Sequence, residues 1–231
     1  MFNLNSLIPA DSGLNLRYAR DINDSGQVVG SATTVEGQGR AFLYSDGQAL
    51  NLGTLGPVFT SPNYSNSSSG EAVNNSGQVV GTAFYGGITP ASGLRRAFLY
   101  SNGAISDLGI LPGFARSTGT DINDLGQVVG YSDLGGGYGG GGNRAFLYSD
   151  GELRNLNDLI PPDSGWTLSN AEAINNNGQI AGTGIFSGRY RAFLATPVPT
   201  SSSILGTSAL SVLGAGFVMR RRWRCKTGEN H

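Results

Sequence analysis

The sequence predicts an all-β fold, a β-propeller-like ring of four repeats that each hold about 50 residues and four strands, followed by a short hydrophobic helix. Three observations support this prediction. Glycine accounts for 37 of the 231 residues, roughly double an average usage of about 7%, which indicates many tight turns. A stretch of nine residues, INDSGQVVG, occurs in four variants, and a second motif, RAFL, follows each of them. We therefore expect short strands rather than helices in the body of the chain.

The first motif defines the repeat period. Its central glycine is predicted to supply the positive φ of a turn between two strands, where a Cβ atom is unfavourable. This glycine recurs after 51, 49 and 52 residues, a period typical of propeller blades. The predicted structural turn glycines are Gly26, Gly77, Gly126 and Gly178.

The second motif begins a strand that is apolar at consecutive positions, from Ala41 to Tyr44 in the first copy. A strand in the middle of a blade is covered on both faces by neighbouring blades, so a continuous apolar run is expected there. The pair Asp46-Gly47, repeated as Asn102-Gly103 and Asp150-Gly151, predicts a tight hairpin to the next strand. Such blades are stabilised by stacking on one another.

The two ends of the repeat region predict how the ring closes. The segment NLNSLIPADSG from Asn3 matches NLNDLIPPDSG from Asn155, and the fourth copy lacks the corresponding strand after Leu194. We expect the N-terminal strand to complete the last blade, which removes an exposed sheet edge. The alternative is that the chain is a truncated fragment of a longer repeat protein.

The composition excludes several function classes. The only histidine is His231 and the only cysteine is Cys225, so the body of the chain offers no Ser-His-Asp triad, no histidine acid–base catalyst and no usual zinc ligand set. Five of the 15 basic residues lie between Arg220 and Lys226, whereas 15 of the 16 acidic residues precede them. The body is therefore acidic, and we expect no nucleic acid partner.

The turn DINDSG at residues 21–26 resembles the opening of a calcium loop, with oxygen-bearing side chains at its first, third and fifth positions. The residue equivalent to Asp21 is Ala72 in the second copy and Ala173 in the fourth, and Ala32 stands where a calcium loop has its bidentate glutamate. We therefore expect no cofactor, calcium included, and interpret the motif as a structural turn.

An arginine begins the second motif in every copy. Because a guanidinium fork suits carboxylates, one arginine per blade is a candidate contact to an acidic sugar. The alternative, which we favour, is a structural arginine that pairs with a nearby aspartate or binds backbone carbonyl groups. These repeated strand arginines are Arg40, Arg96, Arg144 and Arg191.

The repeat resembles the bacterial extracellular repeats of the HAF family. The GQVVG turn, the RAFLY strand and the segment LGTLG at residues 52–56 carry this resemblance, which extends from Met1 to about Ala195. The family has no assigned activity. The resemblance therefore implies a secreted or cell-surface repeat protein and does not indicate a substrate.

The C-terminal residues resemble the PEP-CTERM sorting signal of Gram-negative bacteria that produce exopolysaccharide. The signal consists of a Val-Pro pair and a basic cluster, which an apolar run at residues 204–219 separates. Thr200 and Ser201 depart from the family's motif. The resemblance implies an exosortase as processing enzyme and transient insertion into the inner membrane. An apolar run before a basic cluster also indicates a short membrane span, with a soluble helix as the alternative. The signal residues are Val198, Pro199, Arg220, Arg221 and Arg222.

These patterns divide the chain into a repeat domain at 1–195, a linker at 196–203, a hydrophobic sorting helix at 204–219 and a basic cytoplasmic tail at 220–231. Repetition covers the whole body, so no separate segment is left for an active site. We expect a non-enzymatic extracellular or cell-surface scaffold that binds through its loops, with exopolysaccharide as partner. The alternative is an extracellular glycan hydrolase, which requires a pair of carboxylates in one pocket.

Overall fold

The computed structural model describes residues 1–56, 67–85, 94–135, 142–198 and 222–225. They form four antiparallel four-stranded sheets, and in each sheet the spatial order of the strands follows the chain. The predicted all-β fold of four four-stranded repeats is confirmed. The first sheet contains β1 (Leu14–Ile22), β2 (Val28–Thr34), β3 (Gly39–Ser45) and β4 (Gln48–Asn51), and the second contains β5 (Ser68–Val73), β6 (Val79–Tyr85), β7 (Leu94–Ser101) and β8 (Ala104–Asp107). The third contains β9 (Arg116–Ile122), β10 (Val128–Asp133), β11 (Arg144–Ser149) and β12 (Glu152–Asn155), and the fourth contains β13 (Trp166–Ile174), β14 (Ile180–Phe186), β15 (Arg189–Val198) and β16 (Arg222–Cys225).

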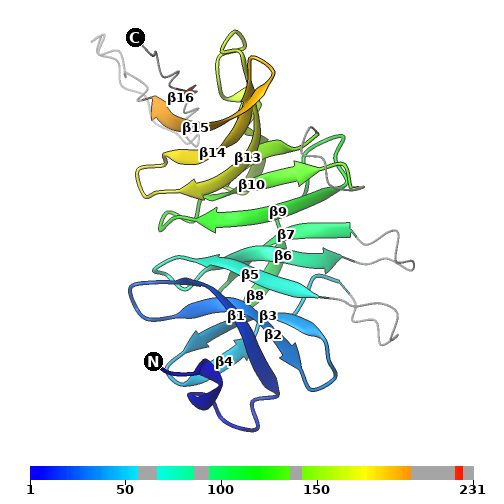
Figure 1. Cartoon of the computed structure of the whole chain (residues 1–231), viewed down its shortest axis with the longest axis vertical. Helices are drawn as coiled ribbons and strands as arrows, with labels where there is room; N and C mark the ends of the chain where they lie inside the picture. The colour runs from blue at the N-terminus through cyan, green and yellow to red at the C-terminus, as the bar shows by residue number, and fades with distance from the viewer. Residues whose placement is uncertain (57–66, 86–93, 136–141, 199–221, 226–231) are drawn as a thin grey trace, which may run out of the picture.

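The sheets follow one another along the long axis of the molecule, so the first and the fourth lie at opposite ends (Figure 1). The first strand of each sheet packs against the sheet before it: β5 contacts β2 and β3, β9 contacts β6 and β7, and β13 contacts β10 and β11. Two short 3-10 helices, η1 (Leu4–Ser6) and η3 (Leu156–Asp158), precede the first and the fourth sheets.

An apolar core fills each junction between sheets. At the first junction, Ala41 and Leu43 of β3 face the second sheet, together with Leu52 and Leu55 of the connecting segment. Phe42, between them in sequence, faces the opposite side of the first sheet. Because side chains alternate along a strand and both faces are covered, the run from Ala41 to Tyr44 is apolar at consecutive positions, as expected.

The predicted closure by an N-terminal strand is wrong. The N-terminal segment forms η1, and Asn5 binds the backbone of β1: its Nδ2 donates to Leu16 O at 2.9 Å and its Oδ1 accepts from Leu16 N at 2.8 Å. The matching Asn157 after β12 makes the same two contacts with Leu168, at 3.0 and 2.7 Å. The sequence match therefore marks a connector that enters a sheet, and not a strand that closes a ring.

The fourth sheet is completed by a different segment. Its fourth strand is β16, which pairs with β15 from Ala195↔Cys225 to Val198↔Arg222. Residues 222–225, predicted as cytoplasmic tail, and residues 196–198, predicted as linker, thus belong to this sheet. The predicted sorting helix at 204–219 lies outside the described residues. Within the described part of the chain, no helix has the length and apolar character needed to cross a membrane.

Candidate binding groove

The repeated turn between the first two strands of each sheet is built by one asparagine. Asn23 Oδ1 accepts hydrogen bonds from the backbone N–H groups of Ser25 at 3.1 Å and Gln27 at 3.0 Å. Its Nδ2 donates to Gln27 Oε1 at 2.7 Å. Gly26 follows with φ 75°, and the other three turn glycines have φ of 73° or 74°, as predicted. The same asparagine–glutamine pair recurs as Asn74–Gln78, Asn123–Gln127 and Asn175–Gln179.

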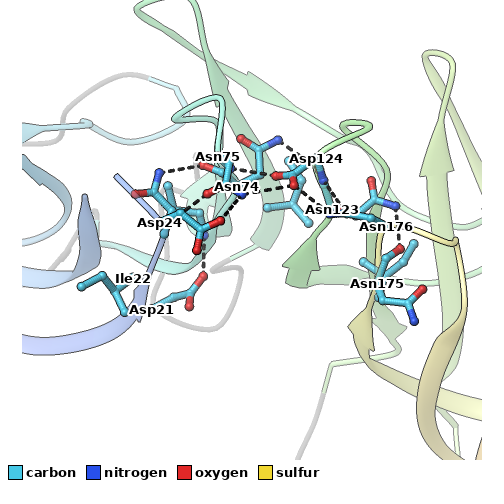
Figure 2. A pocket seen from close by; sticks show the side chains of 13 residues that line it. Asp21, Ile22, Asp24, Asn74, Asn75, Asn123, Asp124, Asn175 and Asn176 are labelled. Atoms are coloured by element: carbon cyan, nitrogen blue, oxygen red, sulfur yellow. Dashed lines mark hydrogen bonds between the residues drawn. The ribbon is translucent and has the colours of Figure 1, made fainter. Parts of the chain in front are cut away.

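The same asparagines tie neighbouring sheets together. Asn23 Nδ2 also donates to Asn74 O at 2.9 Å. Asn74 Nδ2 donates to Asn123 O, and Asn123 Nδ2 donates to Asn175 O, both at 3.0 Å. Figure 2 shows these turns side by side along one face of the four sheets. Asn74 and Asn123, in the inner sheets, are both only 3% exposed.

A second row of side chains runs beside the first and alternates between carboxylate and amide. Asp24 N donates to Asn75 Oδ1 at 3.0 Å, and Asn75 Nδ2 returns a bond to Asp24 Oδ2 at 2.8 Å. Asn75 N donates to Asp124 Oδ1 at 2.9 Å. Asp124 N then donates to Asn176 Oδ1 at 2.8 Å, and Asn176 Nδ2 donates to Asp124 Oδ2 at 2.7 Å. Each of the first three members is therefore bound to its neighbour in the next sheet.

Two further carboxylates connect neighbouring sheets, at the first and the third junction. Val73 N donates to Asp21 Oδ2 at 2.9 Å, and Ile174 N donates to Asp121 Oδ2 at 2.7 Å. The second and fourth sheets carry alanine at the equivalent position. The carboxylates that suggested a calcium loop in the sequence thus accept backbone N–H groups of the next sheet.

The turns enclose a polar groove with a volume of about 300 Å³. Every sheet contributes the end of its first strand and the two residues that follow, so the groove crosses all four repeats (Figure 2). Its wall is formed by Asp21, Ile22, Asn23, Asp24, Val73, Asn74, Asn75, Ile122, Asn123, Asp124, Ile174, Asn175 and Asn176.

Hydrogen bonding and burial shift the pKa values of two of these carboxyl groups in opposite directions. The N–H of Asn75 and the amide of Asn176 lower the pKa of Asp124. Burial raises the pKa of Asp121, and the nearby Asp21 carboxylate adds to the increase, although N–H bonds from Ile174 and Ile122 oppose it. Asp121 is therefore easier to protonate than an ordinary aspartate.

The chemistry available in the groove is hydrogen bonding by amides, carboxylates and backbone groups. Amides both donate and accept, which suits a ligand with many hydroxyl groups. Among the described residues, no cluster of three or more His, Cys, Asp and Glu side chains is placed to hold a metal ion.

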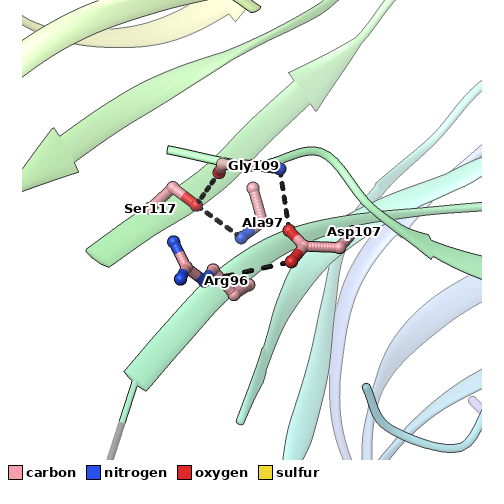
Figure 3. Close-up of polar contacts among 5 residues, drawn as sticks. All are labelled: Arg96, Ala97, Asp107, Gly109 and Ser117. Atoms are coloured by element: carbon pink, nitrogen blue, oxygen red, sulfur yellow. Dashed lines mark hydrogen bonds and ion pairs between the residues drawn. The ribbon is translucent and has the colours of Figure 1, made fainter. Parts of the chain in front are cut away.

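The repeated arginines lie away from the groove, at the edges of the sheet junctions. Figure 3 shows Arg96, whose Nε lies 3.9 Å from Asp107 Oδ2. Arg40 is 4% exposed, donates from Nη1 to Gly39 O at 2.8 Å and also contacts Gln38 Oε1. Arg144 and Arg191 each donate to the preceding carbonyl oxygen at 2.9 Å. These contacts agree with the structural interpretation of the arginines.

A serine next to this arginine position joins two sheets (Figure 3). Ala97 N in β7 donates to Ser117 Oγ in β9 at 2.9 Å, and Ser117 Oγ donates to Gly109 O at 2.6 Å. Ser68 accepts from Ala41 N in the same way at the first junction. This serine was not predicted from the sequence.

The role of the asparagine–glutamine pair was not predicted from the sequence either. Its signal is present, because Asn-x-x-x-Gln occurs in all four copies of the first motif. Of the predicted signal residues, Val198 and Arg222 are paired in the β15–β16 ladder. Pro199, Arg220 and Arg221 lie outside the described residues.

The fold and groove together define a class of repeat protein, in which four-stranded sheets are stacked and joined by rows of asparagine and aspartate. A family model described as a protein of unknown function (DUF3466) matches residues 5–111 and again residues 109–210, and the chain belongs to this family. The first match spans the first and second sheets, and the second match spans the third sheet and β13 to β15 of the fourth.

No curated protein matches the sequence. Among solved structures, the chain is similar to the β-propeller domain of the Trilobed protease from Pyrococcus furiosus, with a TM-score of 0.45 and 12% sequence identity. The alignment covers 78% of this chain and 53% of that chain, so this chain spans about half the length of that structure.

Proposed function

We propose that the protein is a non-enzymatic extracellular scaffold that binds a polysaccharide, such as an exopolysaccharide, along the polar groove. The observation that supports this proposal most is the continuity of the two asparagine and aspartate rows across four sheets. A polymer of hydroxyl-rich units needs repeated hydrogen-bonding groups along one line, and the groove supplies them from four turns. The engagement of its carboxylates by N–H groups favours binding over catalysis.

The test is binding of the full chain to a panel of acidic and neutral bacterial polysaccharides, measured by glycan array and then by calorimetry. The exposed groove residues Asn75 and Asn176 are replaced by alanine, one at a time. Glu36→Ala is the matched control, because Glu36 is an exposed turn residue at the opposite end of β2. We expect the groove variants to weaken binding about tenfold, equivalent to about 1.4 kcal/mol, and the control to bind as the wild type does. Folded wild-type protein that binds none of the panel contradicts the proposal.

A glycan hydrolase is the second candidate, favoured by one specific observation. Asp121 is half-buried, its pKa is raised, and a second carboxylate, Asp21, is close enough to contribute to the increase. A carboxylic acid with a raised pKa beside an ionised carboxylate is the pairing that glycosidases use. Hydrolysis of the same polysaccharides by the wild type, lost in Asp121→Asn and retained in Glu36→Ala, identifies an enzyme. Unchanged polymer length after prolonged incubation excludes this activity for the panel.

We also propose that the protein is exported and sorted through its C-terminal residues. Support comes from the order of Val198, Pro199, the apolar run and the cluster Arg220, Arg221 and Arg222. An exosortase-type enzyme is the expected partner. Fractionation of the native host with intact-mass analysis tests this proposal: a product trimmed near Pro199 and found outside the inner membrane supports it, whereas an untrimmed cytoplasmic chain contradicts it.

A further inference from the structure

The same three positions are covered at every junction between sheets. In the first sheet they are occupied by Val29, Ala41 and Leu43, which are 0%, 0% and 9% exposed. Each packs against the apolar face of the next sheet. Their buried counterparts in the second and third sheets are Val80, Ala97, Val129, Ala145 and Leu147.

In the fourth sheet these positions are exposed. Ala181 and Ala192 are accessible, and Leu194 is 42% exposed. Tyr190, two residues before Ala192 and therefore on the same face of β15, is 53% exposed. The outer face of the last sheet is thus a junction face with no further sheet on it in the described part of the chain.

The opposite face of the first sheet is open only in part: Leu16, Val28, Ala32 and Phe42 on this face are at most 8% exposed and pack with Leu4 and Ile8, but the end of β1 is uncovered. Ile22 is 63% exposed, whereas its counterparts Val73, Ile122 and Ile174 are buried by the preceding sheet, at 5%, 5% and 6%. Leu4 of η1 is only partly buried, whereas the equivalent Leu156 of η3 is fully buried. Terminal repeats of soluble repeat proteins usually have a polar outer face. Both ends of this array instead present apolar side chains.

Both polar rows would continue in register if the first sheet of a second copy were stacked on the fourth sheet. The second row alternates as aspartate, asparagine, aspartate, asparagine and ends at Asn176, and Asp24 is the residue that continues the alternation. In the first row, Asn123 donates to the carbonyl of Asn175 in the following sheet. Asn175 is the equivalent of Asn123 in the last sheet. If the first sheet of a second copy follows it, the carbonyl group that Asn175 faces is that of Asn23 in that copy.

The charges of the two end faces are also complementary. Arg20 of the first sheet pairs with Glu71 of the second, with Arg20 Nε 3.7 Å from Glu71 Oε2. In the fourth sheet the position equivalent to Arg20 is occupied by Glu172, which is exposed. A fourth sheet that meets a first sheet therefore brings Glu172 beside Arg20, the same pair of charges that joins the first two sheets.

We propose that the protein associates head to tail with a second copy of itself, so that the outer face of β14 and β15 covers the outer face of the first sheet of the next copy. The two faces lie at opposite ends of the long axis (Figure 1), so one chain does not bring them together. One contact differs from the first two junctions within a chain. There, a serine of the following sheet accepts a hydrogen bond from a backbone N–H group of the preceding sheet, whereas the first sheet carries Arg17 at this position. Such a heterologous contact either closes into a ring of copies or continues as a filament.

The test is sedimentation of the full-length protein over a range of concentrations. Leu194→Glu places a charge on the outer face of the fourth sheet, and Ile22→Glu places one on the outer face of the first. Both side chains are exposed in one copy, so the variants are expected to fold, which circular dichroism checks. Leu125→Glu is the matched control, because Leu125 is 66% exposed in a turn away from both end faces. We expect concentration-dependent association of wild type and control, and a dissociation constant at least about tenfold higher for each end-face variant.

Mixing the two variants separates head-to-tail contact from other modes of association. Leu194→Glu keeps an intact first face, and Ile22→Glu keeps an intact last face, so an equimolar mixture is expected to form heterodimers with one restored contact. A wild-type chain that stays monomeric up to about 100 μM overturns the proposal. So does association that neither substitution weakens, or a mixture that sediments as two monomers. This test does not depend on the polysaccharide proposed above.

Discussion

At the scale of a residue, Asn123 shows why the turn requires asparagine. Its Oδ1 accepts from Leu125 N at 3.1 Å and Gln127 N at 3.0 Å, and its Nδ2 donates to Gln127 Oε1 at 2.8 Å and Asn175 O at 3.0 Å. The amide therefore uses two donors and two acceptor sites, which is its full capacity. Aspartate lacks the donors and serine has too few groups, so neither replaces it.

We expect Asn123→Ala to lower the free energy of unfolding by about 2 to 4 kcal/mol, because it removes four hydrogen bonds of a buried side chain, including the bond to the next sheet. Asn175→Ala is the matched control, since Asn175 makes the same turn in an exposed position at the end of the row. It is expected to cost about 1 kcal/mol. Urea unfolding of both variants measures the difference. Equal losses contradict the role assigned to the contact between sheets.

The lowered pKa of Asp124 predicts a dependence of stability on pH. A carboxyl group whose pKa is lower in the folded state stabilises the fold above its unfolded pKa of about 3.9, and this contribution is lost as the pH falls through the folded pKa. Asp124→Asn removes the titrating group and replaces one of its two acceptor oxygens by a donor, so that the backbone N–H of Asn75 keeps an acceptor and the amide of Asn176 loses one. We expect this variant to melt below the wild type near neutral pH and the gap between them to narrow below about pH 4. A gap that is constant with pH rules out this linkage.

At the scale of an element, the last glycine of the first motif permits the bulge of the strand beside it. A Cβ atom built on Gly130 lies 2.0 Å from Thr118 O and 2.7 Å from Phe146 Cζ. The pairing of β9 with β10 shifts register at Gly130, where the chain of β9 bulges toward the glycine. Cβ atoms built on Gly30, Gly81 and Gly182 lie 1.8 to 2.1 Å from the equivalent carbonyl oxygen of the neighbouring strand. The motif therefore ends in glycine for lack of space, whereas its central glycine supplies a positive φ.

Gly130→Ala is expected to destabilise the protein by about 2 kcal/mol or more, because backbone and a buried ring must move apart. Gly70→Ala is the matched control: its Cβ has no neighbour closer than 3.4 Å, and the first and fourth sheets carry Ala19 and Ala171 at this position. The control is expected to stay within about 1 kcal/mol of the wild type and to unfold at the same or a higher temperature. Thermal unfolding compares them. A larger loss for the control contradicts this explanation.

The sequence predicts elements better than it predicts contacts between them. Strand content, hairpin turns and the doubly covered RAFLY strand follow from local rules, since Gly26 and the Asp46-Gly47 pair specify their turns alone. The match between Asn3 and Asn155 was misread because both segments carry Leu-rich connector residues that a strand also accepts. The groove was not predicted, because Asn23 and Asn74 meet only when the sheets stack.

At the scale of the whole molecule, the protein behaves as a linear array. Each sheet contacts the next through an apolar core, the bonds of both polar rows and, at two junctions, a serine bond. In such arrays stability is close to a sum of repeat terms and nearest-neighbour terms.

This architecture predicts where the molecule divides when one junction is weakened. Asn74→Ala with Ser117→Ala removes two of the polar bonds of the middle junction, and Asn23→Ala with Ser68→Ala removes the equivalent two at the first junction. We expect native-state hydrogen exchange to show a boundary between β8 and β9 in the first variant and between β4 and β5 in the second. A single opening of all four sheets in both variants would mean that the array is one cooperative unit, because the apolar cores alone would then couple the sheets.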